Sequence, residues 1–193
     1  MLGFDAGVAK ACTLLTELAS RKQAICLIDG RAGSGKSLFA KELSECFFAS
    51  ERQAARVIHM DDLYPGWEGL QAGSRYLNEF ILSPLSRGKT AYWQVWDWDK
   101  SVRGADDEPG NGRREFSGET PLIIEGCGSL SRLSSEHADI RIWIEADMDV
   151  RRKRFSERDD GRFDEFFGIW AAQEDEFYQA ESSPSLADLT ISN

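Results

Sequence analysis

The chain has 193 residues, of which 41% are hydrophobic and 29% are charged, a composition typical of soluble globular proteins rather than of disordered or membrane chains. This length fits one compact domain, residues 1–193. The formal charge of -10 at pH 7 repels phosphate backbones, so we expect no nucleic-acid partner. The sequence has neither a signal-peptide pattern nor an apolar run near the roughly 18 residues of a spanning helix, which predicts a cytoplasmic protein with no membrane contact.

Hydrophobic periodicity predicts alternating helices and strands. Apolar residues three or four positions apart predict a helix over residues 8–18, and Phe39, Leu43, Cys46 and Phe47 mark one face of a second helix. Short apolar runs predict strands at residues 24–28, 56–60, 121–124, 140–144 and 187–191. Such strands separated by helices predict a three-layer α/β fold around a five-stranded, mainly parallel sheet.

Less regular segments lie between these strands. Residues 67–85 are mostly helical in pattern, and residues 91–98 alternate aromatic with polar side chains, which predicts a strand outside the main sheet. Residues 104–118 are rich in Gly, Asp and Glu and predict a loop or hairpin tip. The highly charged residues 150–178 predict two helices around a turn at residues 159–161.

Four cysteines are widely separated and form no CxxC pair: Cys12, Cys26, Cys46 and Cys127. Because only two histidines could complete a metal site, we interpret the cysteines as buried, free thiols in a reducing compartment. His59 and His137 have no partner pattern, so both are expected to be structural.

A glycine loop carries the strongest signal in the chain. Residues 30–37 read GRAGSGKS and match the Walker A pattern GxxxxGK[ST] between a predicted strand and a predicted helix. Glycines allow the tight turn in which backbone N–H groups point at phosphate oxygens, beside the positive end of the helix dipole. Lys36 would reach the β- and γ-phosphates of ATP, and the Ser37 hydroxyl would bind Mg²⁺. The predicted nucleotide-binding residues are Gly30, Arg31, Ala32, Gly33, Ser34, Gly35, Lys36, Ser37 and Leu38.

Carboxylates follow two of the predicted strands, at the sheet edge where parallel α/β folds bind ligands. Asp61 or Asp62 could accept the proton of an attacking hydroxyl, although aspartates also cap turns. Glu125 ends a strand and could bind the metal, or it could bind nearby backbone.

An arginine-rich run follows the strand at residues 140–144. At helical spacing Arg151, Arg154 and Arg158 share one face, which suits the charge of a transferring phosphoryl group. The alternative is a solvated face paired with nearby acidic residues. The aromatic side chains of residues 92–98 could stack on a planar ligand, or they could pack in the core or at a dimer contact.

Four segments in this order, IDGRAGSGKS, MDDLY, LIIEG and IEADMDVRRKRFSERD, resemble the uridine kinase group of P-loop nucleoside kinases, which includes phosphoribulokinase-like and pantothenate-kinase-like relatives. The resemblance implies a P-loop NTPase fold with an arginine-bearing lid. It also implies that Asp61 is the catalytic base, that Tyr64 contacts the substrate, and that Arg154 and Arg158 belong to the lid.

The segment WDWDKSVR, residues 96–103, is similar to the acceptor-binding segment of the same family. The resemblance implies that Asp97 and Arg103 hold the acceptor beside Trp96. Ser101 stands where the pyrimidine-specific members carry histidine. We therefore expect a hydroxylated acceptor without a strict preference for uridine or cytidine.

The sequence thus predicts transfer of the γ-phosphate of Mg-ATP to a hydroxyl group of a small metabolite. The predicted catalytic residues are Lys36, Asp61, Arg154 and Arg158, and the predicted metal ligands are Ser37 and Glu125. Alternatives are a nucleoside monophosphate or coenzyme-precursor kinase, an antibiotic-modifying phosphotransferase, and a nucleotide-binding regulatory ATPase switch. The acceptor, the nucleotide base and the oligomeric state are left open.

Overall fold

The computed structural model describes residues 1–20, 23–107 and 112–193, and its centre is a six-stranded sheet. The strand order is β1 (Leu2–Gly3), β10 (Leu189–Ser192), β9 (Ile140–Glu145), β2 (Ile25–Asp29), β8 (Leu122–Glu125) and β3 (Arg56–His59). All neighbouring strands are parallel, and the five predicted strands are among them. The sequence-based count missed β1, because two residues are too few to show a hydrophobic period.

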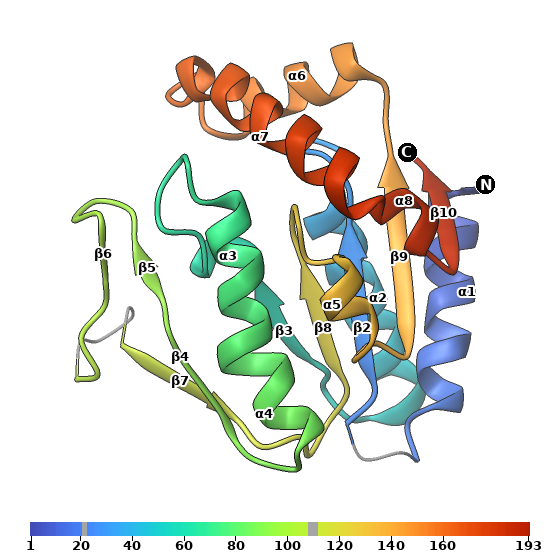
Figure 1. Cartoon of the computed structure of the whole chain (residues 1–193). Helices are drawn as coiled ribbons and strands as arrows, with labels where there is room; N and C mark the ends of the chain where they lie inside the picture. Colours follow the sequence, from blue (N-terminus) through green and yellow to red (C-terminus); the bar gives the residue numbers. More distant parts are fainter. Residues whose placement is uncertain (21–22, 108–111) are drawn as a thin grey trace.

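Helices cover both faces of the sheet and confirm three layers (Figure 1). One face carries α1 (Phe4–Glu17) and α2 (Lys36–Glu51); the other carries α3 (Leu70–Tyr76), the π-helical segment η2 (Leu77–Leu82) and α4 (Ser83–Ser86). Alternate residues of β2 serve the two cores: Ile25 and Leu27 pack on one face, and Cys26 and Ile28 on the other. This two-sided burial explains why the central strands are continuously apolar.

Two helices lie across the carboxyl ends of the strands, where the predicted lid was expected (Figure 1). They are α6 (Met148–Arg158), which follows β9, and α7 (Phe167–Glu181), with the short 3-10 segment η3 (Asp164–Phe166) between them. The helix α8 (Ser183–Leu186) then leads into β10. The two predicted helices around residues 159–161 are thus present.

Two antiparallel ribbons stand outside the main sheet. The first pairs β4 (Ala91–Gln94) with β7 (Arg113–Phe116), and the second pairs β5 (Trp96–Asp97) with β6 (Val102–Arg103). The predicted outer strand at residues 91–98 is therefore confirmed, with a break between β4 and β5. Of the loop expected at residues 104–118, the end forms β7, and residues 108–111 lie outside the described residues.

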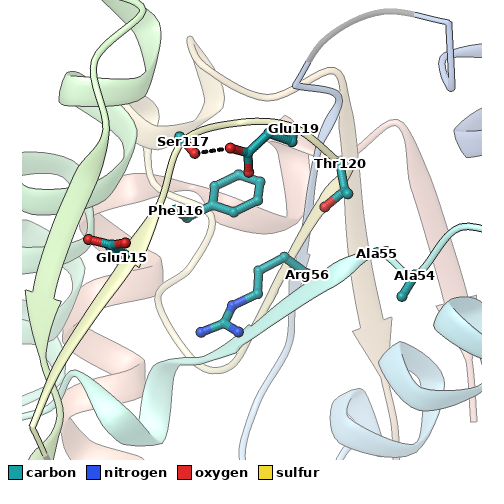
Figure 2. A pocket seen from close by; sticks show the side chains of 8 residues that line it. All are labelled: Ala54, Ala55, Arg56, Glu115, Phe116, Ser117, Glu119 and Thr120. Carbon is teal, nitrogen blue, oxygen red and sulfur yellow. Dashed lines mark hydrogen bonds between the residues drawn. The ribbon is translucent and has the colours of Figure 1, made fainter.

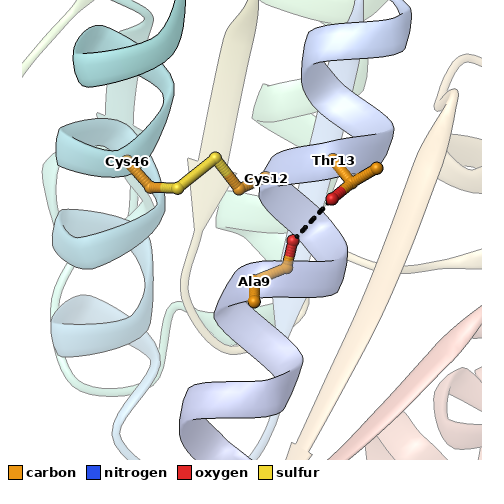
Figure 3. The surroundings of a disulfide bond; sticks show 4 residues. All are labelled: Ala9, Cys12, Thr13 and Cys46. Carbon is orange, nitrogen blue, oxygen red and sulfur yellow. Dashed lines mark hydrogen bonds between the residues drawn. A yellow bond between two sulfur atoms is a disulfide. The ribbon is translucent and has the colours of Figure 1, made fainter.

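The cysteine prediction was wrong for two of the four residues. Cys12 of α1 and Cys46 of α2 form a disulfide (Figure 3). The two helices pack side by side on one face of the sheet, so residues 34 positions apart in sequence have Cα atoms 6.2 Å apart. Cys26 and Cys127 are free and buried, as predicted. Cysteine usage therefore no longer supports a reducing compartment.

Within the described ranges, no helix has both the length and the hydrophobicity that crossing a membrane requires.

Candidate functional site

The predicted phosphate loop connects the end of β2 at Asp29 to the start of α2 at Lys36. Gly33 and Gly35 have φ angles of 76° and 99°, which L-residues with a side chain rarely adopt. A Cβ on Gly33 would overlap the carbonyl oxygen of Arg151, and a Cβ on Gly35 would overlap the side-chain amide of Asn193. The loop is thus packed tightly against the lid and β10. No side chain caps the N-terminus of the 16-residue helix α2, which leaves its first N–H groups for an anion.

Lys36 is nearly buried in this loop, and its Nζ donates to the carbonyl oxygen of Arg31 at 2.9 Å. Burial alone would lower the pKa of Lys36. The surrounding negative groups, among them Glu125 and Glu174, outweigh burial and raise this pKa. Lys36 therefore stays charged at neutral pH, as contact with phosphate requires.

Ser37, Glu125 and His59 form a chain of polar contacts at the ends of α2, β8 and β3. The Ser37 hydroxyl donates to Glu125 Oε1 at 3.1 Å, and the same oxygen lies 2.6 Å from His59 Nδ1. This hydrogen bond raises the pKa of His59. A hydroxyl and a carboxylate oxygen side by side are the ligand types that Mg²⁺ prefers, so the predicted pair fits the metal. His59, expected to be structural, is the neighbour that sequence reasoning did not connect to Glu125.

Asp61 lies in the 3-10 turn η1 (Met60–Asp62) directly after β3, and its side chain is 66% exposed. Its Oδ2 is 4.0 Å from Nη1 of Arg158, which belongs to the lid helix α6. Partial loss of hydration beside the neighbouring protein atoms, and the negative charge of Glu125, raise the pKa of Asp61. Of the two adjacent aspartates, Asp61 is thus the one that faces a lid arginine.

The lid arginines have different roles. Arg154 Nη1 is buried, has no hydrogen-bond partner among the described residues, and lies 3.9 Å from the point that a Cβ on Gly35 would occupy. A buried donor without a partner beside the glycine loop fits a phosphate oxygen. Arg158 pairs with Asp159 at 2.7 Å and approaches Asp61. Arg151, expected on the same phosphate-facing surface, instead donates to the carbonyl oxygen of Ala32.

Three of the predicted acceptor-binding residues have hydrogen-bond partners within the fold, and their contact with an acceptor stays a prediction. The Tyr64 side chain is buried, and its hydroxyl donates to the carbonyl oxygen of Cys127 at 2.6 Å. Asp97 Oδ1 accepts the N–H groups of Asp99 and Lys100, both at 3.0 Å.

Arg103 is likewise part of the scaffold. Its guanidinium donates to the carbonyl oxygens of Leu63 at 2.6 Å and Gln94 at 3.2 Å, and it lies 3.8 Å from the ring centroid of Tyr76. This arginine ties the β5–β6 ribbon to the turn after β3. The predicted acceptor-binding segment therefore also supports the turn that follows Asp61, and its role in binding the acceptor stays a prediction. Trp96 stays a prediction; its Nε1 is buried without a partner among the described residues.

The aromatic cluster is centred on Trp67 rather than on residues 92–98. The Trp67 ring stacks on Phe166 of the lid, with centroids 4.6 Å apart and an interplanar angle of 4°. It also contacts Trp98 at 5.1 Å, and Trp98 Nε1 donates to the carbonyl oxygen of Asp61 at 3.0 Å. Trp93 is buried in the core. The rings therefore join the lid to the segment that carries Asp61, and Trp98 remains 37% exposed.

Asp29 was missed by sequence reasoning. It is fully buried at the end of β2, and its carboxylate accepts hydrogen bonds from the N–H groups of Gly30 and Leu130 and from the hydroxyl of Tyr178. Burial raises the pKa of Asp29 to about 6. Its position just before the glycine loop was the only signal in the sequence. Its partners Leu130, in the loop after β8, and Tyr178, in α7, lie 101 and 149 residues further along the chain.

Two hollows lie away from this site. One, of about 440 Å³, is lined by Arg56 at the start of β3 and by side chains near the end of β7 (Figure 2). It lies at the amino end of β3, whereas the glycine loop follows the carboxyl end of β2. The other, of about 320 Å³, lies between α6 and α7 and includes Arg152 and Phe167. Neither is lined by Lys36 or Asp61, so neither extends the candidate site.

The sequence matches no protein-family model and no curated protein. Solved structures do match. A protein described as a possible uridine kinase from Bacillus stearothermophilus has a TM-score of 0.67 and 16% identity, with 97% of this chain and 98% of that chain covered. A candidate fructose transport system kinase from Silicibacter sp. TM1040 has a TM-score of 0.62 and 21% identity, with 95% and 98% covered.

D-glycerate 3-kinase from Cryptococcus neoformans is also similar, with a TM-score of 0.56, 11% identity, and coverage of 96% of this chain and 89% of that chain. At these identities the similarity defines the fold. The chain has the mixed α/β fold of P-loop kinases, with the architecture of the uridine kinase-like structures.

Proposed function

We propose that this chain is a kinase that transfers the γ-phosphate of Mg-ATP to a hydroxyl group of a small metabolite. The observation that carries the proposal is the placement of Asp61 and the two lid arginines. Arg154 presents a free donor to the glycine loop, and Arg158, one helical turn further on, lies 4.0 Å from the Asp61 carboxylate. A phosphate held by the loop and a hydroxyl held by Asp61 would thus lie under the same helix.

In the proposed reaction, Asp61 accepts the proton of the acceptor hydroxyl as its oxygen attacks the γ-phosphorus. The bond from that phosphorus to the β–γ bridging oxygen breaks, and its electron pair leaves with ADP. Lys36 and Arg154 stabilise the charge of the transferring group. Ser37 and Glu125 would hold Mg²⁺, which neutralises phosphate charge when bound.

The acceptor should be compact rather than a stacked nucleobase. Trp67 contacts both Trp98 and the lid, and Asp97 and Arg103 have hydrogen-bond partners within the fold. Two of the similar structures are described as kinases of hydroxylated compounds, a uridine kinase and a D-glycerate kinase. The second, smaller acceptor is closer to the class that we infer for this chain.

A screen of acceptor-dependent ADP release tests the proposal. Small polyols, sugars, hydroxy acids and nucleosides would be compared at equal concentration, with Asp61→Asn as the matched blank. We expect release that depends on one small hydroxylated acceptor and disappears in Asp61→Asn. ADP release that is equal with and without every acceptor would instead support a regulatory ATPase.

A further inference from the structure

One residue of the glycine loop is held by the lid through both of its backbone groups. The N–H of Ala32 donates to Glu174 Oε1 of α7 at 2.6 Å. The carbonyl oxygen of Ala32 accepts a hydrogen bond from Arg151 Nη1 of α6 at 3.3 Å. The two helices of the lid thus bind the same residue of the loop through the two successive peptide units that flank its Cα.

The two side chains that hold Ala32 also contact each other in a dry environment. Arg151 Nη1 is 3.9 Å from Glu174 Oε2, and the two residues are 6% and 1% exposed. Cys127 donates to the same Glu174 carboxylate, and Arg31 Nη1 lies 3.6 Å from it. A buried ion pair is often no more stable than an apolar pair of similar size, so stability alone does not explain these charges.

The position of Arg151 in the sequence connects this pair to the catalytic arginines. Arg151 lies in the first turn of α6, one turn before Arg154 and two turns before Arg158. Its Nε also donates to the carbonyl oxygen of Ala146, which precedes the helix. Fixing Arg151 to the loop therefore fixes the distance between the loop and the two guanidinium groups further along the same helix.

We propose that Arg151 and Glu174 are positioning residues that clamp the glycine loop to the lid, so that Arg154 and Arg158 stay aligned with the transferring phosphoryl group. The inference rests on the proposed kinase function. Neither residue needs to touch ATP or the acceptor. Small displacements of groups that act in the transition state reduce rates by up to about 10²-fold, so loss of the clamp should lower kcat.

Glu174→Gln tests the clamp, because it keeps the size and an oxygen acceptor for Ala32 but removes the charge that compensates Arg151. We expect kcat to fall at least about tenfold while the KM for ATP changes less than about threefold, since ATP is held mainly by loop N–H groups and Lys36. Glu176→Gln is the matched control, because Glu176 lies on the same helix and is exposed. The control should keep the wild-type kcat.

A double-variant cycle separates positioning from general structural damage. If Glu174 acts through the two lid arginines, adding Glu174→Gln to the Arg154→Ala/Arg158→Ala variant should cause no further loss of kcat. Arg151→Met/Glu174→Met replaces the buried pair with apolar side chains and should stay folded with a reduced kcat. Two results would overturn the proposal. One is a further fall of kcat when Glu174→Gln is added to the variant without the lid arginines, and the other is a wild-type kcat in the folded Arg151→Met/Glu174→Met variant.

Hydrogen exchange of the Ala32 amide gives a measurement that does not depend on activity. The Glu174 carboxylate should protect this amide, so exchange should accelerate in Glu174→Ala and stay unchanged in Glu176→Gln. Equal exchange in wild type and Glu174→Ala would refute the clamp. If amide exchange accelerates in Glu174→Ala as expected but the wild-type protein phosphorylates no acceptor, the kinase function is refuted and the clamp remains supported.

Discussion

The glycine loop and the β5–β6 ribbon both border Asp61, but they differ in how their polar groups are used. Beside the loop, the buried Arg154 Nη1 and Ser34 Oγ have no partners among the described residues. In the ribbon, the carboxylate of Asp97 and the guanidinium of Arg103 bond to nearby protein groups. The charged donor beside the loop is left for a ligand, whereas the charged groups of the ribbon have protein partners; the indole N–H of Trp96, buried without a partner among the described residues, is the ribbon's exception.

The largest expected effect is at Asp61, which both regions border. Asp61→Asn keeps the shape of the side chain but cannot accept the hydroxyl proton, so acceptor phosphorylation should fall by roughly 10²–10⁴-fold. ATP binding, measured by calorimetry, should stay close to that of the wild type. Asp62→Asn is the control and should retain most activity. If Asp62→Asn is the more damaging change, the base has been assigned to the wrong aspartate.

On the loop side, Lys36→Ala should lower kcat by roughly 10²–10³-fold, the range seen when one group that stabilises transition-state charge is removed. Circular dichroism should show a folded protein, because the helix α2 and its packing are unchanged. Lys41→Ala, an exposed lysine on the same helix, provides the comparison. Near-normal turnover in folded Lys36→Ala would show that this loop does not serve phosphoryl transfer.

Asp29 differs from the other polar groups beside the loop, because its carboxylate accepts hydrogen bonds from protein groups. Its pKa is about 6 in the folded protein, against its usual 3.8. The folded state therefore binds more protons between these values, and the stability contributed by Asp29 is present below pH 3.8 and lost as pH rises through 6. Two pH units correspond to about 3 kcal/mol.

Urea denaturation of wild type and Asp29→Asn between pH 3.5 and 7 measures this effect. The asparagine does not titrate, so contributions of other groups largely cancel in the difference between the two free energies of unfolding. We expect the wild-type value minus the Asp29→Asn value to fall by about 3 kcal/mol over this range. A difference that is constant with pH would mean that burial does not hold Asp29 protonated.

The sheet and the phosphate loop were predictable because their determinants are local. Apolar runs mark the strands, and a glycine loop builds its anion site from its own backbone, so residues 30–37 are sufficient to specify it. Other features depend on which elements become neighbours in the fold. Examples are the disulfide between Cys12 and Cys46, the hydrogen bond from Ala32 to Glu174, and the stacking of Trp67 on Phe166 of the lid. One sequence contains no direct record of those neighbours.

Asp97 shows why acceptor-binding residues are harder to predict than the glycine loop. An aspartate in a turn can bind a substrate or accept N–H groups two and three residues ahead, and both uses leave the same local pattern. Resemblance favoured the first use. The structure shows the second use, in which the N–H groups of Asp99 and Lys100 donate to Asp97 Oδ1, and the acceptor contact stays a prediction.

Asp97 therefore gives the smallest and most discriminating test. Asp97→Ala removes the acceptor for two N–H groups in a partly exposed turn, so the free energy of unfolding should fall by about 1–2 kcal/mol. Asp97→Asn keeps an acceptor oxygen for the turn and should cost less. Because neither variant changes the groups that face the loop, the KM for the best acceptor should stay within about twofold of wild type in both, since uniform binding contacts are what KM reports. A large rise of that KM in folded Asp97→Asn would mean that this carboxylate does hold the acceptor, and it would return the β5–β6 ribbon from scaffold to binding site.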